Sequence, residues 1–147
     1  MQKIQIIFYN LIPYTELLCM LFGFFHFKKL KNTYWKWFVY YMVFITIVEF
    51  FSLYYLKYFP YLRKYYFDFF VIPIEFLFLY WLYAKKSLQN EKLYKVSCVI
   101  YLVFYCLHLF ILDSVRIVSS MSYTVGIFLL AIMVYLEFVK QIKSDEI

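Results

Sequence analysis

Four ionisable side chains lie deep inside long apolar stretches of this sequence: Glu16, Glu49, Glu75 and His108. Glu75, for example, is the only charged residue of the run VIPIEFLFLYW, residues 71–81. A carboxyl group held away from water favours its neutral form, and it can then exchange a proton, bind a cation or anchor an amine-bearing ligand. These residues are therefore the first candidates for chemistry.

Further polar side chains line one face of the helix expected around His108. Ser97, Tyr101, Tyr105 and His108 recur at i, i+4, i+8 and i+11, which places them in one stripe of an otherwise apolar helix. We expect this stripe to meet the carboxyl groups of the other helices near the middle of a bilayer. A similar stripe in the last apolar stretch contains Ser119, Ser122, Gly126 and Glu137. The predicted ligand- or ion-binding residues are Glu16, Glu49, Glu75, Tyr101, Tyr105 and His108.

A structural role is the alternative interpretation of the same residues. A protonated Glu in a membrane helix donates a good interhelical hydrogen bond, worth about 0.6 to 2 kcal/mol, so these carboxyl groups could simply hold helices together. The sequence contains no GxSxG, HExxH or Gly-rich phosphate motif, and it has only two histidines and two glycines. We therefore predict no enzymatic activity, no catalytic residue, no metal site and no cofactor.

The composition indicates the environment for which these helices are built. Hydrophobic residues make up 66% of the 147 residues and charged residues 16%, whereas an ordinary soluble domain is roughly half apolar and about a quarter charged. Cys19, Cys98 and Cys106 all lie in apolar runs, so we expect them to behave as small hydrophobic side chains and not as a disulfide framework. The composition predicts an integral membrane protein.

Five segments are long and apolar enough to cross a hydrocarbon core, which takes about 20 residues of helix. The predicted fold is all-α, a single transmembrane domain over residues 1–147, and its connectors are short enough to make consecutive helices antiparallel neighbours. The first segment is long and lacks a small-residue cleavage site, so we do not expect a removable signal peptide. The predicted transmembrane helices cover residues 4–27, 38–59, 66–84, 96–112 and 117–139.

The distribution of lysines and arginines predicts that the N-terminus lies outside and the C-terminus inside. In that orientation ten of them fall on the inner side and five on the outer side, in the sense of the positive-inside rule. We expect the lysine-rich inner connectors to contact anionic lipid headgroups, so the net charge of +6 indicates a lipid partner and not nucleic acid. The inner ten are Lys28, Lys29, Lys31, Lys36, Lys85, Lys86, Lys92, Lys95, Lys140 and Lys143, and the outer five are Lys3, Lys57, Arg63, Lys64 and Arg116.

An internal similarity appears at an offset of 60 residues. The run from Tyr34 to Phe50 matches the run from Tyr94 to Phe110 at six positions, and the Ile12-Pro13 pair matches Ile72-Pro73. A duplicated two-helix unit would explain these matches, and repeats of this kind occur in transporters, where the binding site lies between the repeats. Chance matches in a chain so rich in Phe, Tyr and Val are the other explanation. The six matched pairs are Tyr34/Tyr94, Val39/Val99, Tyr41/Tyr101, Val43/Val103, Phe44/Phe104 and Phe50/Phe110.

Two phrases, ITIVEFFSLYYLKYF (45–59) and VIPIEFLFLYWLY (71–83), each place a Glu before an aromatic-aliphatic run. Together with the proline of Leu11-Ile12-Pro13 in the first helix, they resemble a family of uncharacterised bacterial multi-pass membrane proteins of about seven helices, a likeness that does not by itself identify an activity. The five predicted helices depart from that pattern, which would make this chain a shortened relative or an incomplete one. The resemblance implies the bacterial inner (cytoplasmic) membrane.

These observations lead to one predicted function and one rival. We predict a polytopic inner-membrane protein in which Glu and His groups at the midplane form a ligand, ion or proton site, as in a sensor or a transporter. The rival is an accessory or assembly subunit that works with a second copy or with a membrane partner protein, and in which the buried Glu residues only make helix contacts.

Overall fold

The computed structural model describes residues 2–55, 58–111 and 119–145, and these residues form an all-α protein. The chain divides into two compact units, Met1–Tyr66 and Phe67–Ile147. Each unit is built around its own helix contacts and is described separately below.

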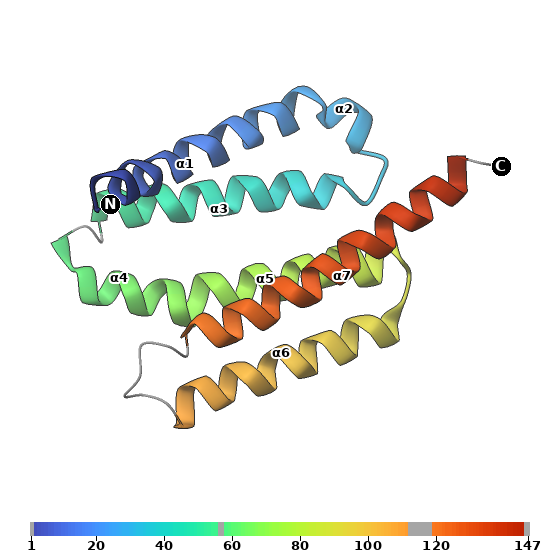
Figure 1. The fold of residues 1–147 in the computed structure, drawn as a ribbon. Coiled ribbons are helices and arrows are strands. Elements are labelled where there is room, and N and C mark those ends of the chain that lie inside the picture. Colours follow the sequence, from blue (N-terminus) through green and yellow to red (C-terminus); the bar gives the residue numbers. More distant parts are fainter. Residues whose placement is uncertain (1, 56–57, 112–118, 146–147) are drawn as a thin grey trace. The chain divides into compact units, whose positions relative to one another are not determined.

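Unit 1 is an antiparallel pair of long helices with two short additions. Its elements are α1 (Gln2–Phe25), α2 (Phe27–Leu30), α3 (Lys36–Tyr55) and α4 (Pro60–Tyr66). Figure 1 shows α1 lying beside α3, with α2 at the turn between them. Proline suits the first turn of a helix because its missing N–H would have no helical acceptor there, which explains why α4 begins at Pro60.

Two contacts define how α1 and α3 are aligned. A Cβ atom on Gly23 would lie 3.3 Å from a methyl group of Val39, so the glycine brings the two backbones close together. Further along the pair, the rings of Tyr14 and Phe50 pack edge to face with centroids 6.3 Å apart. These two contacts fix the register of the helix pair in unit 1.

Unit 2 contains three long helical stretches that all contact one another. The first stretch is continuous and consists of the π-helical segment η2 (Phe67–Val71), the α-helix α5 (Ile72–Tyr80) and a second π-helical segment, η3 (Trp81–Ser87). It is followed by α6 (Glu91–Ile111) and α7 (Ser119–Asp145), which Figure 1 shows in yellow-orange and red.

The position of η2 has a local cause in the sequence. Pro73 has no N–H to donate, and in an α-helix its ring would also collide with the carbonyl group four residues earlier. A π-helical turn bonds each carbonyl to the N–H five residues later instead of four, so it changes the pairing of the carbonyls that precede a proline. The π-helical turn directly before Pro73 is therefore the expected accommodation of a proline inside a long helix.

The turn between η3 and α6 is short and specifically capped. Gln89 has a φ angle of 54°, in the left-handed region, and reverses the chain. Asn90 follows as the N-cap of α6, because its Oδ1 atom accepts a hydrogen bond of 2.9 Å from the backbone N–H of Leu93. The backbone N–H of Asn90 donates in turn to the carbonyl of Ala84, at 2.8 Å. The connector therefore consists of only residues 88–90.

The core of unit 2 is an aromatic cluster. Phe76, Tyr80 and Ala84 recur every four residues on one side of the first stretch and are buried against Tyr101 of α6 and Met133 of α7. The hydrophobic periodicity of the sequence is thus realised as a core shared by three helices.

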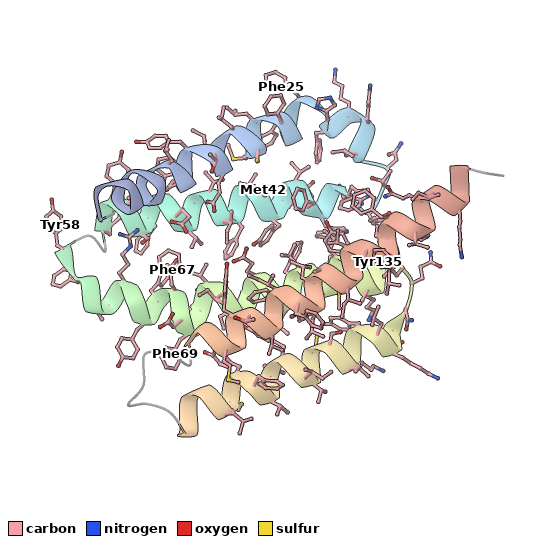
Figure 2. The ribbon with its side chains drawn as sticks, viewed as in Figure 1. Phe25, Met42, Tyr58, Phe67, Phe69 and Tyr135 are labelled. Atoms are coloured by element: carbon pink, nitrogen blue, oxygen red, sulfur yellow. The ribbon has the colours of Figure 1, made fainter. Side chains whose placement is uncertain are left out.

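Large apolar side chains also cover the outside of the helices. Phe22, Ile47, Val99 and Phe128 are among the exposed hydrophobic residues, and Figure 2 shows Phe25 on the side of α1 turned away from α3, where it is 81% exposed. Such surfaces are unfavourable in water and natural in lipid. Among the described residues, three helices are long and apolar enough to cross a membrane: Lys36–Tyr55, Phe67–Ser87 and Met121–Lys143. By helix composition the protein is a multi-pass membrane protein.

Each of the five predicted helical segments coincides over most of its described residues with a helix, but the ends differ. The helices continue past the predicted spans into charged sequence, as at residues 85–87, 91–95 and 140–145, because hydropathy marks only the lipid-crossing part while caps decide where a helix ends. Residues 60–65, which the predicted spans 38–59 and 66–84 leave as a connector, belong to the helix α4. The number of five membrane spans, the N-outside orientation and the single domain remain predictions.

The proposed duplication finds mixed support in burial. Tyr41 and Tyr101 are both buried, as equivalent positions should be. Val39 is buried while its counterpart Val99 is 60% exposed. The duplication therefore stays a hypothesis.

Candidate functional site

Glu75 and Tyr101 lie near the middle of their helices in unit 2. Glu75 is close to the centre of the continuous stretch from Phe67 to Ser87, and Tyr101 is the midpoint of α6. The carboxyl group of Glu75 is half-buried and within electrostatic range of the Tyr101 hydroxyl group. Two of the predicted site residues are therefore brought together within one unit.

The Tyr101 hydroxyl group is the most unusual polar group in this region. Tyr101 is fully buried, and its hydroxyl group has no hydrogen-bond partner among the described residues. A buried donor without a partner costs about 1 to 3 kcal/mol, and such a group in a native structure requires an explanation. One explanation is that the hydroxyl group forms a hydrogen bond with a ligand or water molecule that binds only transiently.

Tyr105 continues the same face of α6 by one turn. The rings of Tyr101 and Tyr105 are stacked with centroids 6.1 Å apart, and the two residues share one helix face, as the i, i+4 spacing predicts. The Tyr105 hydroxyl group donates to the backbone carbonyl of Asp68 at 3.2 Å. Tyr105 therefore joins α6 to η2, whereas the Tyr101 hydroxyl group makes no such bond among the described residues.

The aromatic surroundings of Tyr101 are tightly packed. The Phe76 ring lies 5.2 Å from the Tyr101 ring, centroid to centroid, and the Tyr80 ring lies 6.0 Å away. Tyr80 donates its hydroxyl hydrogen bond to the carbonyl of Gly126 at 2.9 Å. A Cβ atom on Gly126 would lie only 2.7 Å from the Phe76 ring, so α7 can approach α5 this closely only with glycine at this position.

The other predicted carboxyl groups, Glu16 and Glu49, belong to unit 1. The register of α1 and α3 places Glu16 level with the turn formed by residues 46–48 of α3, which is at most one turn, about 5 Å along the axis, from Glu49. Oε2 of Glu16 is buried, and Glu49 acts electrostatically on Tyr66 at the end of α4. Unit 1 therefore brings Glu16 and Glu49 to a similar level of one helix pair.

The remaining predicted residue, His108, lies on α6 seven residues beyond Tyr101, or about 10 Å along the helix. The side chain of His108 lies outside the described residues. The predicted meeting of His108 with Glu16, Glu49 and Glu75 joins this side chain and residues of different units, and it remains a prediction. Among the side chains that the structure describes, no three His, Cys, Asp or Glu groups lie together in a way that could hold a metal ion.

A second polar cluster, which was not among the predicted site residues, lies at the other end of unit 2. Glu137 of α7 is only 4% exposed, and its carboxylate accepts a hydrogen bond from the Ser87 hydroxyl group. Gln141 donates to the same carboxylate at 3.3 Å. The ammonium group of Lys140 donates to the backbone carbonyl of Ser87. Residues Ser87, Glu137, Lys140 and Gln141 thus connect α7 to the end of η3.

The spacing of polar residues in the last helix included Glu137, but its position near the predicted end of the span gave no reason to expect a buried site residue. Glu137 falls on the predicted stripe of the last helix, but only two residues from the predicted end of that span at residue 139, where a charged residue is ordinary. Its burial depends on η3 extending to Ser87, three residues beyond the predicted helix end at residue 84. That extension is a tertiary feature that hydropathy does not report.

Comparisons with known proteins gave no match: no family model matches the chain, and no curated protein or solved structure is significantly similar to it. The resemblance to a seven-helix family therefore stays a prediction. The three long apolar helices are consistent with a multi-pass membrane protein.

Proposed function

We propose that the protein is a multi-pass membrane protein with a proton-exchanging site at Glu75 and Tyr101, acting as a sensor or transporter. The observation that carries this proposal is the fully buried Tyr101 hydroxyl group, which has no hydrogen-bond partner among the described residues and lies in electrostatic range of Glu75. An ionisable residue within a membrane helix is costly to insert, so Glu75 is a candidate for a functional site.

The packing around the site favours a proton over a larger ligand. Phe76, Tyr80 and Tyr101 are almost completely buried, and the Phe76 ring is in close contact with the backbone of α7 at Gly126. Such a core has little room for a cation with its ligands or for an amine-bearing molecule. A proton needs no cavity, since it can move between a carboxyl group and a hydroxyl group through one hydrogen bond or one water molecule.

The proposal includes the wider setting predicted from the sequence. The protein has five spans in the bacterial inner membrane, its N-terminus lies outside, and it is not an enzyme. Glu16 and Glu49 form an acidic level within unit 1, and His108 of unit 2 is a further exchangeable group. No nucleic acid is involved.

The accessory-subunit alternative is favoured by a different observation. Two buried polar contacts, Tyr80 with Gly126 and Ser87 with Glu137, join α7 to the first stretch of unit 2. Polar groups in this unit therefore do hold helices together. Under this alternative, Glu75 also serves only to hold helices together. In this case the protein acts through a second copy or a membrane partner protein.

Infrared difference spectroscopy of the protein in lipid vesicles separates the two functions. If Glu75 exchanges protons, a carboxylic-acid carbonyl band should titrate with pH, and Glu75→Gln should remove that band. Tyr101→Phe should shift the midpoint of this titration by about one pH unit, because the hydroxyl group interacts differently with the two protonation states.

The matched control is Tyr80→Phe, which removes an equally buried hydroxyl group whose hydrogen bond is already committed to Gly126. This control should leave the titration midpoint unchanged and lower the stability by about 0.6 to 1.7 kcal/mol. If Glu75→Gln leaves the pH-dependent spectrum unaltered, or if both tyrosine variants act alike, the proton site is wrong and the accessory role is the better account.

A further inference from the structure

Lysines from three elements gather at one end of unit 2. Glu91, at the start of α6, forms ion pairs with Lys85 of η3 at 3.4 Å and with Lys95 of α6 at 3.8 Å. Lys140 of α7 donates to the carbonyl of Ser87 at the end of η3. The ends of η3 and α7 and the beginning of α6 therefore lie together. We call this set the basic end: Lys85, Lys86, Lys92, Lys95, Lys140 and Lys143.

The positive charge of the basic end is only partly compensated. All six lysines are exposed, and the described side chains here include just two carboxylates, Glu91 and Glu137. Glu137 is buried and bonded to Ser87 and Gln141, so it does not neutralise the surface. Glu91 is shared between Lys85 and Lys95. Among the described side chains of this end, positive charge is therefore in excess, and the sequence adds two acidic residues, Asp145 and Glu146, after Lys143.

Aromatic residues place this charge at a specific depth in a membrane. The ammonium group of Lys86 lies over the Trp81 ring, 5.1 Å from its centroid, and Lys85 lies over the Tyr94 ring at 5.9 Å. Trp and Tyr favour the level of the lipid headgroups, and lysine side chains extend from there to the phosphate groups. The lysines therefore lie where headgroup phosphates are found.

From this arrangement we infer that the basic end selectively holds anionic phospholipids, whose headgroup phosphates are bound by lysines of η3, α6 and α7. A zwitterionic lipid has a phosphate as well, but its own ammonium or choline group offsets the charge, so it gains less from an excess of lysine. The inference rests on the proposed membrane location and does not depend on proton exchange at Glu75.

The test uses Trp81 as a local reporter. The chain has three tryptophans, so the double substitution Trp35→Phe and Trp37→Phe leaves only Trp81, beside Lys86. This protein is placed in two preparations of phosphatidylcholine vesicles. One contains brominated phosphatidylcholine and the other contains brominated phosphatidylglycerol at the same mole fraction. The bromine quenches the fluorescence of Trp81 on contact. We expect the anionic lipid to be enriched about fivefold around Trp81, and we expect high salt to reduce this enrichment.

Two triple variants locate the effect. Lys92→Gln, Lys95→Gln and Lys143→Gln together should bring the enrichment close to one, whereas Lys28→Gln, Lys29→Gln and Lys31→Gln, which remove the same charge from unit 1, should leave it unchanged. Equal quenching by both lipids, or the same loss in both triple variants, would overturn the inference. If neither lipid quenches Trp81, the membrane location itself is wrong, while a failure of the Glu75 experiment leaves this inference standing.

Discussion

At the scale of single residues, unit 2 contains two tyrosines of similar burial and opposite bonding. Tyr80 donates to the carbonyl of Gly126, whereas the Tyr101 hydroxyl group finds no partner among the residues that the structure describes. Residue spacing predicted Tyr101 and Tyr105 on one face of a helix. It did not predict which tyrosine hydroxyl would be bonded, because that depends on the carbonyls of a different helix. Sequence therefore identifies candidate side chains better than it identifies their partners.

Gly126 offers a test of this packing. Gly126→Ala places a Cβ atom 2.7 Å from the Phe76 ring, inside the aromatic core, so the ring or the helix must shift. We expect a loss of about 1 to 3 kcal/mol in the free energy of unfolding, measured by denaturant titration in detergent micelles with circular dichroism. Gly23→Ala is the control, since its Cβ atom would meet a methyl group of Val39 at 3.3 Å and needs only a small adjustment. Equal stability of the two variants would show that α7 is not held against α5 as described.

At the scale of helices, hydropathy located the long apolar helices, but it predicted neither the short helix α4 nor the π-helical segments. The spacing of Asp68 and Glu75, seven residues apart, places both on one face of a regular α-helix. Asp68 lies within the π-helical segment η2, where the rotation per residue is smaller than in an α-helix, so the seven-residue spacing no longer specifies one common face. Pro73 is visible in the sequence, yet a proline can be accommodated by a kink, a break or a π-helical turn, and packing decides among these.

The N-cap of α6 leads to a prediction about this element. Asn90→Ala removes the acceptor of the hydrogen bond from the Leu93 N–H, and we expect the free energy of unfolding to fall by about 1 kcal/mol. Asn90→Asp keeps an acceptor at the same position and should retain most of the stability. Thermal unfolding in micelles, followed by circular dichroism, measures both. A loss of similar size in Asn90→Asp would mean that the cap is not the source of the effect.

At the scale of the whole molecule, composition was sufficient to predict a membrane protein but not to predict which helices contact one another. The share of apolar residues predicted membrane helices, and three described helices are long and apolar enough to cross a bilayer. The predicted midplane cluster required helices of two units to meet, and no periodicity within one helix can specify such a contact. The class of a membrane protein is thus encoded locally, whereas a site between helices depends on packing.

The predicted orientation can be measured by cysteine labelling in intact bacterial cells. In a background with Cys19, Cys98 and Cys106 replaced by alanine, the single variants Thr33→Cys and Lys92→Cys should react with an impermeant maleimide only after the inner membrane is permeabilised. Tyr58→Cys should react in cells whose inner membrane is intact, because the connector around it lies outside in the predicted orientation. The reverse pattern would establish the opposite orientation.

The three-residue connector at residues 88–90 has a consequence for how the protein is made. If α6 crosses the bilayer as proposed, the two helices joined by this connector cannot be inserted one after the other, because the connector is too short for one to span the membrane while the other is still in the cytosol. The stretch from Phe67 to Ser87 and the helix α6 must therefore be inserted as one hairpin, with their transfer free energies added together. The favourable transfer free energy of the strongly apolar stretch Phe67–Ser87 then compensates for the more polar α6, with its tyrosines, when the hairpin enters the lipid during biogenesis.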